Sequence, residues 1–263
     1  MTETALKPEI QELLASIQSR RLTVGVIGLG YVGLPLAVEF AEQGVPTFGF
    51  EVDEKKVTAL NSGKNYIEDL DSAHVGKLCT SGALRATLDF SKLRECDAVF
   101  ICVPTPFTPN KEPDISFIEQ AADQLAQNMK DKQVIILKST TFPGTTEKYV
   151  LPILARSGKQ VGKDFFLAFS PERIDPGNKH WNTRNTPIVV GGVDEPSTKL
   201  AAAVTAIAIE KVIEVSSPAI AEMEKLLENI FRSVNIALVN EMAQLCDRIG
   251  VNIWEVISAA STK

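Results

Sequence analysis

The sequence is poor in cysteine and histidine, which limits the metal and redox chemistry open to it. Its four cysteines stand at positions 79, 96, 102 and 246, with no Cys-x-x-Cys pair and no spacing typical of a zinc site. Free thiols in a reducing cytosol are the simplest interpretation. The two histidines, His74 and His180, have no neighbours that indicate a general base. We therefore predict no metal site and no chemistry that depends on histidine.

Basic tracts and long apolar runs are missing as well. Asp and Glu outnumber Lys and Arg by 33 to 27, giving a net charge of −6, so nucleic acid is not an expected partner. The longest apolar-looking run, residues 24–38, is rich in glycine and too short to span a bilayer. The first 20 residues carry acids and no apolar segment like that of a signal peptide. We expect a soluble cytoplasmic protein without a membrane partner.

Short apolar strands alternate with helices along most of the chain. Its 263 residues, 44% of them hydrophobic, can form one large domain or one domain plus part of another. An amphipathic helix is expected over residues 8–20, before the alternation begins. The expected strands are 22–27, 46–51, 98–103, 133–138, 165–169, 187–191 and 212–215, and the expected helices are 33–43, 53–62, 115–130, 145–157 and 196–208. This order predicts an α/β fold with a doubly wound parallel, Rossmann-like sheet.

The first expected strand runs into a glycine motif at Gly28, Gly30 and Gly33. In such a motif the first glycine permits a tight turn, the second lets a pyrophosphate approach the backbone, and the third lets helix and strand pack closely. The helix that follows offers N–H groups and the positive end of its dipole to phosphates. These glycines, with Tyr31 and Val32 between them, are predicted to bind a dinucleotide cofactor. The alternative is a glycine-rich turn that merely packs.

Glu51 ends the second expected strand, 23 residues after Gly28. A dinucleotide-binding fold places at this position the carboxylate that accepts hydrogen bonds from the adenosine ribose. Because a carboxylate repels a 2′-phosphate, Glu51 predicts NAD rather than NADP as the cofactor. Asp53 is an alternative for this role, but it lies beyond the strand. Lys56 is predicted to reach the adenosine side.

Polar residues also follow three later strands. Pro104 and Thr105 follow strand 98–103, Thr140 follows strand 133–138, and Glu172 follows strand 165–169. Ligands of open α/β sheets collect at the carboxyl ends of the strands. We therefore expect Thr105 to line the cofactor cleft and Thr140 and Glu172 to stand at its edge. The alternatives are a helix N-cap for Thr140 and a plain surface carboxylate for Glu172.

After residue 215 the pattern changes to one long helix, predicted from Pro218 through Ile249. Apolar residues recur every three or four positions along it, from Ile220 to Ile249, with no glycine or proline after Pro218. This helix is unusually long. It is either a plain connector or, as we expect, a helix that packs against a second domain or a second copy of itself.

Five motifs, in this order along the chain, resemble those of the nucleotide-sugar 6-dehydrogenases, which include UDP-glucose, UDP-N-acetylhexosamine and GDP-mannose dehydrogenases. The matching segments are 28–35, 102–106, 138–140, 170–173 and 224–229. The resemblance implies oxidation of a sugar C6 alcohol to a carboxylate with two NAD. It also implies a Rossmann-like NAD domain over 21–215 and the start of a central helical domain over 216–263, and we assign residues 1–20 to the N-terminal helix that precedes them. That central domain, through helix 218–249, would form a homodimer.

The same resemblance implies roles for four residues. Lys225 stabilises the alkoxide or oxyanion, with Asn229, four residues on and on the same helix face, as its hydrogen-bond partner. Glu172 is the general base for water in thioester hydrolysis, and Thr140 positions that water and touches the nicotinamide ribose. Without the resemblance, Lys225 beside two glutamates would be interpreted as a solvated surface charge.

The residues after Glu172 indicate which UDP-sugar is the substrate. UDP-glucose enzymes have a second glutamate where this chain has Pro176, and residues 172–177, Glu-Arg-Ile-Asp-Pro-Gly, resemble the UDP-N-acetylglucosamine branch. We expect UDP-N-acetylglucosamine as the substrate, with UDP-N-acetylmannosamine and UDP-glucose as alternatives.

The cysteine nucleophile of the family lies in a Gly-Gly-His-Cys-Ile-Pro-type motif that the 263 residues do not contain. The C-terminal sugar-nucleotide domain is also absent from them, so the chain is expected to be the N-terminal part of a larger enzyme. Two other interpretations stay open. One is an inert NAD-binding or assembly fragment, and the other is a dehydrogenase of the 6-phosphogluconate or hydroxyacid type, for which no substrate motif is found.

Overall fold

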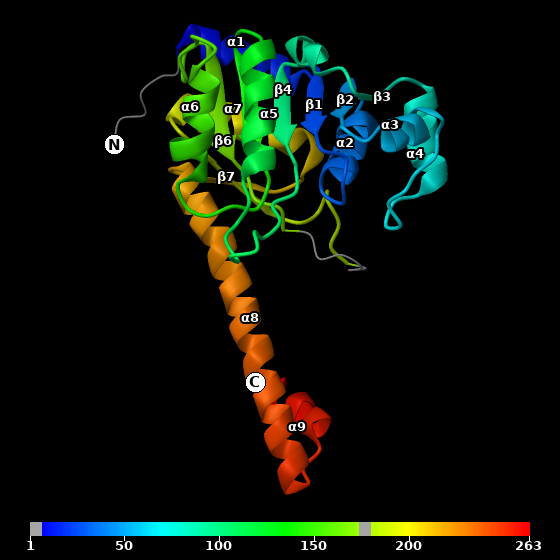
Figure 1. Cartoon of the computed structure of the whole chain (residues 1–263), viewed down its shortest axis with the longest axis vertical. Helices are drawn as coiled ribbons and strands as arrows, with labels where there is room; N and C mark the ends of the chain where they lie inside the picture. Colours follow the sequence, from blue (N-terminus) through cyan, green and yellow to red (C-terminus); the bar gives the residue numbers. More distant parts are fainter. Residues whose placement is uncertain (1–6, 174–179) are drawn as a thin grey trace. The chain divides into compact units, whose positions relative to one another are not determined.

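The computed structural model describes residues 7–173 and 180–263, and its described strands form one eight-stranded sheet (Figure 1). The strands lie in the order β3-β2-β1-β4-β5-β6-β7-β8. They are β1 (Val24–Ile27), β2 (Thr47–Phe50), β3 (Leu84–Thr87), β4 (Ala98–Ile101), β5 (Gln133–Leu137), β6 (Phe165–Phe169), β7 (Ile188–Gly192) and β8 (Val212–Val215). The order reverses direction between β1 and β4, which is where open α/β sheets bind their ligands.

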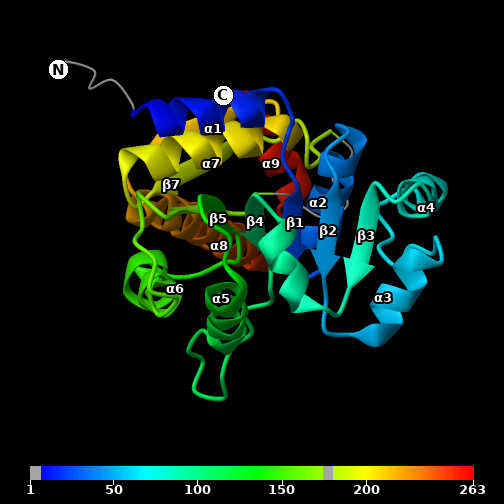
Figure 2. The ribbon, with the colours of Figure 1, turned by 90° about the horizontal axis from the view of Figure 1, so that it is seen from above.

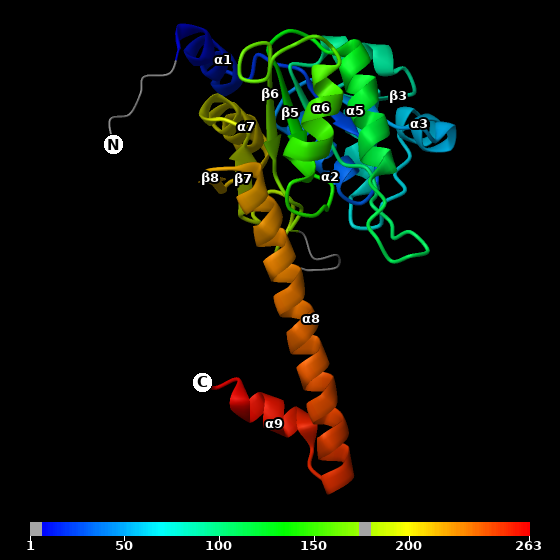
Figure 3. The ribbon, with the colours of Figure 1, turned by 60° about the vertical axis from the view of Figure 1, so that its left-hand side comes forward.

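Helices cover both faces of this sheet (Figures 2 and 3). On one face α2 and α7 pack against the strands, and α1 packs on α7, whereas α5 and α6 cover the other face. The helices are α1 (Pro8–Gln18), α2 (Gly33–Glu42), α3 (Glu54–Asn61), α4 (Ser72–Thr80), α5 (Ser116–Asn128), α6 (Leu151–Ala155), α7 (Glu195–Ala208), α8 (Pro218–Ile249) and α9 (Ile253–Ala260). A 3₁₀ turn, η1 (Phe90–Glu95), and a π-helical turn, η2 (Thr146–Val150), complete the described elements.

The predicted doubly wound, Rossmann-like sheet is confirmed, with one departure from parallel pairing. Strands β1 to β6 pair in parallel, and so do β7 and β8, but β7 runs antiparallel to β6. A parallel return needs a crossover, usually a helix. The link from β6 to β7 contains no helix in the residues that are described. The expected strand 187–191 was therefore placed correctly in the chain but given the wrong direction.

Some elements were not predicted at all. Between residues 62 and 98 the chain forms α4, β3 and η1, and beyond Gly250 it forms α9. Edge strand β3 is Leu-Arg-Ala-Thr, in which Arg85 is exposed and Leu84 and Ala86 are buried. Only four residues carry this alternation, so it is too short to be distinguished from a loop in the sequence.

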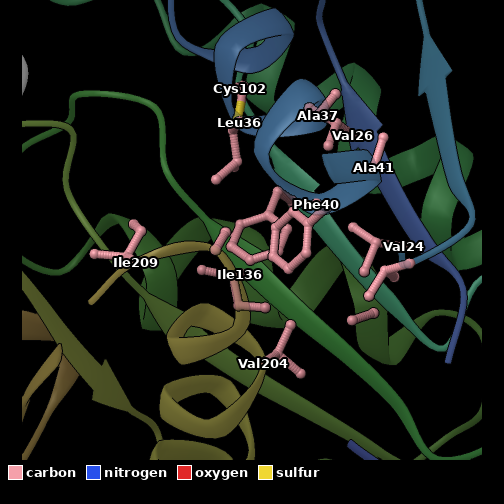
Figure 4. Packing of buried hydrophobic residues seen from close by; sticks show 14 of the residues in the cluster. Val24, Val26, Leu36, Ala37, Phe40, Ala41, Cys102, Ile136, Val204 and Ile209 are labelled. Carbon is pink, nitrogen blue, oxygen red and sulfur yellow. The ribbon is translucent and has the colours of Figure 1, made fainter. Parts of the chain in front are cut away.

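Two layers of apolar side chains hold the helices to the sheet. In one layer, Phe40 of α2 meets Phe100 of β4 with ring centroids 5.3 Å apart. Figure 4 shows Phe40 among Val24, Ile136 and Val204, which come from β1, β5 and α7. Every residue of β1, β4, β5 and β6 is buried. Strands covered on both faces are expected to be continuously apolar, as these are apart from Gln133 at the start of β5.

The chain divides into two compact units, residues 1–223 and residues 224–263. Helix α8 begins in the first unit and continues through most of the second. It ends where Gly250 takes a positive φ of 74° and the backbone N–H of Val251 donates to the carbonyl of Cys246 (2.9 Å). The side chain of Asn252 then caps α9 by accepting from the N–H of Trp254 (3.0 Å). Among the described helices, none is long and apolar enough to cross a membrane.

Candidate cofactor cleft

A cavity of about 970 Å³ lies in the first unit, at the carboxyl ends of β1, β2, β4, β5 and β6. Most of the residues predicted from the sequence to bind cofactor or act in catalysis line it. They are Gly28, Gly30, Tyr31, Val32, Glu51, Lys56, Pro104, Thr105, Thr140 and Glu172. The structure thus brings together side chains from segments up to 144 residues apart in the chain. A cavity of this size is in the range that holds cofactor-sized ligands.

The three glycines of the motif have different structural roles in the loop beside the cavity. Gly28 has φ of 89°, and a Cβ there would approach the carbonyl oxygen of Cys102 to 2.7 Å. A Cβ on Gly33 would collide with the carbonyl oxygen of Gly28, so Gly33 is a packing glycine and does not line the cavity. A Cβ on Gly30 would meet nothing within 4 Å. Gly30 therefore leaves open space where a pyrophosphate can reach the backbone.

The N-terminus of α2 faces this same loop. Its N-cap position is Val32, and no side chain caps it. The first N–H groups of a helix have no partner inside the helix and attract anions, together with the positive end of the dipole. The geometry of the loop and of α2 therefore fits a bound pyrophosphate.

Glu51 follows β2 directly and is held by the backbone around it. Its carboxylate accepts from the N–H of Leu29 (3.1 Å) and the N–H of Val52 (2.9 Å), and Lys56 Nζ lies 3.4 Å away. The side chain is only 9% exposed, but the residue lines the cavity. The N–H of Asp53 also donates to this carboxylate (3.3 Å), so four donors engage its four acceptor sites, and a ribose hydroxyl would take the place of the longest contact, the one from Lys56. The residues present fit the adenosine half of NAD.

Asp53, the alternative to Glu51, also lines the cavity and has a structural role as well. Its side chain caps α3 by accepting from the N–H of Lys55 (2.9 Å). A cap of this kind stabilises the helix start. The hydroxyl of Tyr66 adds a further brace to the loop, donating to the carbonyl of Leu29 (2.8 Å).

The segment after β5 carries Lys138, Ser139 and Thr140 into the cavity wall. Ser139 is buried and its hydroxyl donates to the carbonyl of Val103 (2.8 Å), joining this segment to the one after β4. Thr140 is exposed in the cavity. It is not a helix N-cap, because the next helical turn begins at Thr146 and Thr145 precedes it.

Glu172 forms an ion pair that the sequence did not predict. Lys138 Nζ lies 3.2 Å from its carboxylate and 3.4 Å from the carbonyl oxygen of Pro171. The Lys138 side chain is 2% exposed and that of Glu172 is 13% exposed. A buried ion pair of this kind is costly to break from one side, because the remaining charge stays in a poorly hydrated place. Glu172 is therefore not a plain surface carboxylate.

Of the four cysteines, only Cys102 is among the residues that line the cavity. The expected strand 98–103 includes Cys102, but β4 ends at Ile101 and Cys102 is the next residue. Burial raises the pKa of the Cys102 thiol to about 12, and it does the same for Cys96. Burial also raises the pKa of Cys79. A nucleophilic cysteine needs a lowered pKa, so these three thiols are poor candidates.

Lys225 and Asn229 lie in the second unit, four residues apart on α8, whereas the other predicted site residues lie in the first. Phe90 of η1 was not predicted to line the cavity, and neither were two further contributions. One is the face of α5, which supplies Phe117 and Gln124, and the other is Lys138. A lysine directly after the apolar residues 134–137 is a signal for Lys138, whereas nothing in the helical pattern of α5 distinguishes a face that lines a cleft.

Comparisons with known proteins agree with this geometry. Residues 22–209 match the NAD-binding domain of the UDP-glucose/GDP-mannose dehydrogenase family, and residues 219–263 match the central domain of that family. A UDP-N-acetyl-D-glucosamine 6-dehydrogenase of Pseudomonas aeruginosa is 34% identical over 247 residues, covering 92% of this chain and 57% of the relative. A UDP-N-acetyl-D-mannosamine dehydrogenase of Pyrococcus horikoshii is 35% identical over 242 residues, covering 92% of this chain and 58% of the relative.

Solved structures give the same result. The UDP-D-ManNAc dehydrogenase structure from Pyrococcus horikoshii superimposes with a TM-score of 0.86 at 34% identity, covering 92% of this chain and 58% of the other. A ternary complex of GDP-mannose dehydrogenase from Pseudomonas aeruginosa has the same TM-score of 0.86 at 26% identity, covering 92% of this chain and 57% of the other. The chain thus spans a little under three fifths of the length of these relatives. It belongs to the UDP-glucose/GDP-mannose dehydrogenase family, and residues 22–209 are the NAD-binding domain of that family.

Proposed function

We propose that this chain supplies the NAD-binding part of a nucleotide-sugar 6-dehydrogenase, which oxidises the C6 alcohol of a UDP-sugar to a carboxylate in two hydride transfers. The observation that carries the proposal is the single cavity that holds the glycine loop, Glu51, Thr140 and Glu172 together. Membership of the family speaks against the 6-phosphogluconate and hydroxyacid alternatives.

The orientation of the cofactor follows from the sheet order. Glu51 at the end of β2 takes the adenosine ribose, and the glycine loop after β1 takes the pyrophosphate. Thr140 and Glu172, on the side of β4, β5 and β6, would then be the residues that hold the nicotinamide half. NAD, when bound, supplies the hydride acceptor.

Thr140 and Glu172 are the proposed catalytic residues of the first unit. Glu172 acts as the general base that removes a proton from the water that cleaves the thioester. Lys138 holds the Glu172 carboxylate in place through their 3.2 Å contact. Thr140, exposed in the cavity, orients that water and contacts the nicotinamide ribose through its hydroxyl.

Lys225 and Asn229 are the proposed catalytic residues of the second unit. In this proposal the Lys225 ammonium group stabilises the negative charge that develops on the sugar oxygen, and Asn229 donates a second hydrogen bond. Their spacing of four residues on α8 puts them on one helix face. The cysteine that would hold the aldehyde is none of Cys79, Cys96 and Cys102, because burial raises the pKa of each of these thiols.

For the substrate we propose UDP-N-acetylglucosamine, with UDP-N-acetylmannosamine and UDP-glucose as alternatives. Relatives of similar identity are named for UDP-N-acetyl-D-glucosamine and for UDP-N-acetyl-D-mannosamine, so identity does not separate the two. The motif that favours the first continues from Glu172 to Gly177, and its residues 174–177 lie outside the described part of the chain.

We further propose domains at 1–20, 21–215 and 216–263, and a homodimer formed through helix 218–249. Large apolar side chains on α8 support the dimer, since Leu227, Phe231, Val234 and Leu238 are each at least 58% exposed. Exposed apolar surface of this extent is typical of an interface.

Calorimetric titration of NAD into the chain, followed by addition of each UDP-sugar, tests the proposal. We expect NAD to bind to the 263 residues, and each UDP-sugar to bind only to a longer enzyme that includes the sugar-nucleotide domain. A chain that binds NAD and dimerises, but responds to no UDP-sugar even as part of a longer enzyme, would be the inert assembly fragment instead. Failure to bind NAD would overturn both interpretations.

A further inference from the structure

A buried carboxylate with no place in the proposed reaction stands at the start of α8. Glu222 is 1% exposed, in the part of α8 that belongs to the first unit. Its carboxylate accepts three hydrogen bonds: from the N–H of Gly144 (2.5 Å), from the N–H of Thr146 (2.9 Å) and from the hydroxyl of Thr146 (2.7 Å). All three donors come from one short loop, 76 to 78 residues away in the chain.

That loop leads directly from the cavity. It starts at Thr140, which lines the cavity, and ends at the π-helical turn η2. Thr145 and Thr146 are fully buried, and the hydroxyl of Thr145 donates to the carbonyl of Phe142 (2.7 Å). The far end of the loop is therefore anchored by Glu222 and by its own turn, while Thr140 at the near end is exposed.

A carboxylate at the N-terminus of a helical turn is favourable in itself, because it satisfies N–H groups that have no helical partner. That alone would explain a stabilising residue. Three further features point beyond it. The donors include a side-chain hydroxyl, the carboxylate is almost fully enclosed, and the anchored loop carries a residue of the cofactor cleft.

We propose that Glu222 is a positioning residue for Thr140: it fixes the 140–146 loop so that the Thr140 hydroxyl stands ready for the nicotinamide half of NAD. The inference rests on the proposed function, in which NAD lies with its adenosine half at Glu51. Glu222 itself touches no part of the cavity, since it is not among the residues that line it.

The position of Glu222 predicts an effect limited to one half of the cofactor. Loosening the loop should weaken contacts near Thr140 and leave those at Glu51 and the glycine loop unchanged. NAD and ADP separate the two, because ADP retains the adenosine and both phosphates but has no nicotinamide ribose. A residue that only stabilised the fold would change both affinities or neither.

The variant Glu222→Gln has the right size to test this. Its amide offers one acceptor oxygen and one N–H₂ donor, so the donors of Gly144 and Thr146 cannot all be satisfied. We expect NAD affinity to fall about tenfold, as for one lost hydrogen bond to a charged group, and ADP affinity to stay unchanged. Thr146→Val removes only the hydroxyl bond and should cause a smaller loss in the same direction.

Asp194→Asn is the matched control, since Asp194 caps α7 by accepting from the N–H of Ser197 (2.7 Å) and does not line the cavity. It makes the same carboxylate-to-amide change at another helix N-terminus and should alter neither affinity. A double-mutant cycle with Thr140→Ala completes the design. If Glu222 acts through Thr140, Glu222→Gln should have little further effect on NAD affinity when Thr140 is already alanine.

Equal losses for NAD and ADP, no loss for either, or additive effects in the cycle would each overturn the proposal. If Glu222→Gln does not fold, as judged by circular dichroism, Thr146→Val decides by the same comparison. Failure of the unmodified chain to bind NAD or ADP would instead refute the proposed function, so the two failures are distinguishable.

Discussion

The two units of the chain differ in how far their apolar side chains are exposed. In residues 1–223 the apolar side chains of the strands are enclosed, and Phe40, Phe100, Phe165 and Phe169 are at most 1% exposed. In residues 224–263, Cys246 is the single buried residue, and Phe231 is 69% exposed. The first unit has its own buried core, whereas the second leaves large apolar side chains exposed.

The two units also differ in their proposed functions, which are cofactor binding in the first unit and catalysis on the sugar in the second. Every residue proposed to hold NAD lies in the first unit, with a complete cavity and its own buried core. Lys225 and Asn229, proposed to act on the sugar, lie in the second. We therefore expect cofactor binding to be a property of the first unit alone, and catalysis to require the second unit in its proper surroundings.

The largest expected effect concerns turnover. The 263 residues alone should bind NAD and form no NADH from UDP-N-acetylglucosamine, UDP-N-acetylmannosamine or UDP-glucose. Hydride transfer needs the sugar held against the nicotinamide, and positioning of that kind contributes roughly 7–11 kcal/mol. Absorbance at the NADH band measures it. Steady NADH formation would contradict the separation of cofactor binding from catalysis. It would make Cys246, near the C-terminal end of α8, the candidate nucleophile.

Replacing a phenylalanine in each unit sharpens the comparison. Phe40→Ala should lower the free energy of unfolding by about 3–5 kcal/mol, because it empties a fully enclosed site beside Phe100. Phe231→Ala should cost less than about 0.5 kcal/mol in dilute solution, where its site is exposed. If α8 associates, the effect of Phe231→Ala should grow with protein concentration, whereas that of Phe40→Ala should not. Urea unfolding at two protein concentrations measures these free energies of unfolding.

Self-association through α8 is the next effect in size. The double variant Ile230→Asp with Leu238→Asp puts two charges on the apolar face and should weaken the dimer at least about a hundredfold. Light scattering after gel filtration should then show a monomer. Asn235→Asp with Asn240→Asp adds the same charge to the same helix without removing apolar surface, and should leave a dimer. A monomer for the unmodified chain at high concentration would refute the interface.

A smaller effect concerns pH and belongs to the first unit. Burial, together with the neighbouring carboxylates of Glu42 and Glu210, raises the pKa of Glu39 to about 7, although Arg184 and His74 oppose this. The folded pKa exceeds the ordinary value of 4.5, so the protonated form is favoured on folding. That contribution is present below pH 4.5 and is lost as pH rises through 7.

Glu39→Gln should therefore stabilise the protein at pH 8 relative to the unmodified chain, by about 1–2 kcal/mol, and change little at pH 4.5. Unfolding by urea at both pH values measures the difference. Glu147→Gln, at an exposed position of the π-helical turn, serves as the control. A gain of equal size at both pH values would show that the charge of Glu39 is not its cause.

The sequence predicted the first unit far better than its edges. Strands such as Val99-Phe100-Ile101 and Ile135-Ile136-Leu137 are buried on both faces, so their apolar runs are unmistakable. The glycine loop could be recognised equally well, because Gly28 and Gly33 have no room for a Cβ and Gly30 leaves open space beside the backbone. Strand β3 and helix α4 were missed because they are short and half-exposed, so that burial leaves only a faint pattern.

Contacts between distant segments were beyond the sequence. Lys138 could be recognised as a polar residue at a strand end, but its pairing with Glu172 depends on β5 and β6 lying side by side. Glu222 appeared to be one more glutamate on a long helix. Its burial against Gly144 and Thr146 follows only from the way the start of α8 packs on the first unit's loop. Sequence patterns describe faces of single elements, whereas these contacts join elements.

The smallest expected effect concerns the choice of cofactor. NAD should bind more tightly than NADP, because the Glu51 carboxylate accepts from the ribose hydroxyls and repels a 2′-phosphate. Lys56, 3.4 Å from that carboxylate, offsets part of its charge. Glu51→Ala should therefore narrow the preference by about tenfold, roughly 1.4 kcal/mol, since Lys56 is then released toward the phosphate. Glu51 also accepts from the N–H of Leu29, so its loss should weaken both cofactors, and the ratio of their affinities is the quantity to measure. Lys56→Ala in the same background should reverse part of the narrowing. Equal affinities in the unmodified chain, or an unchanged ratio in Glu51→Ala, would show that Glu51 does not select the cofactor.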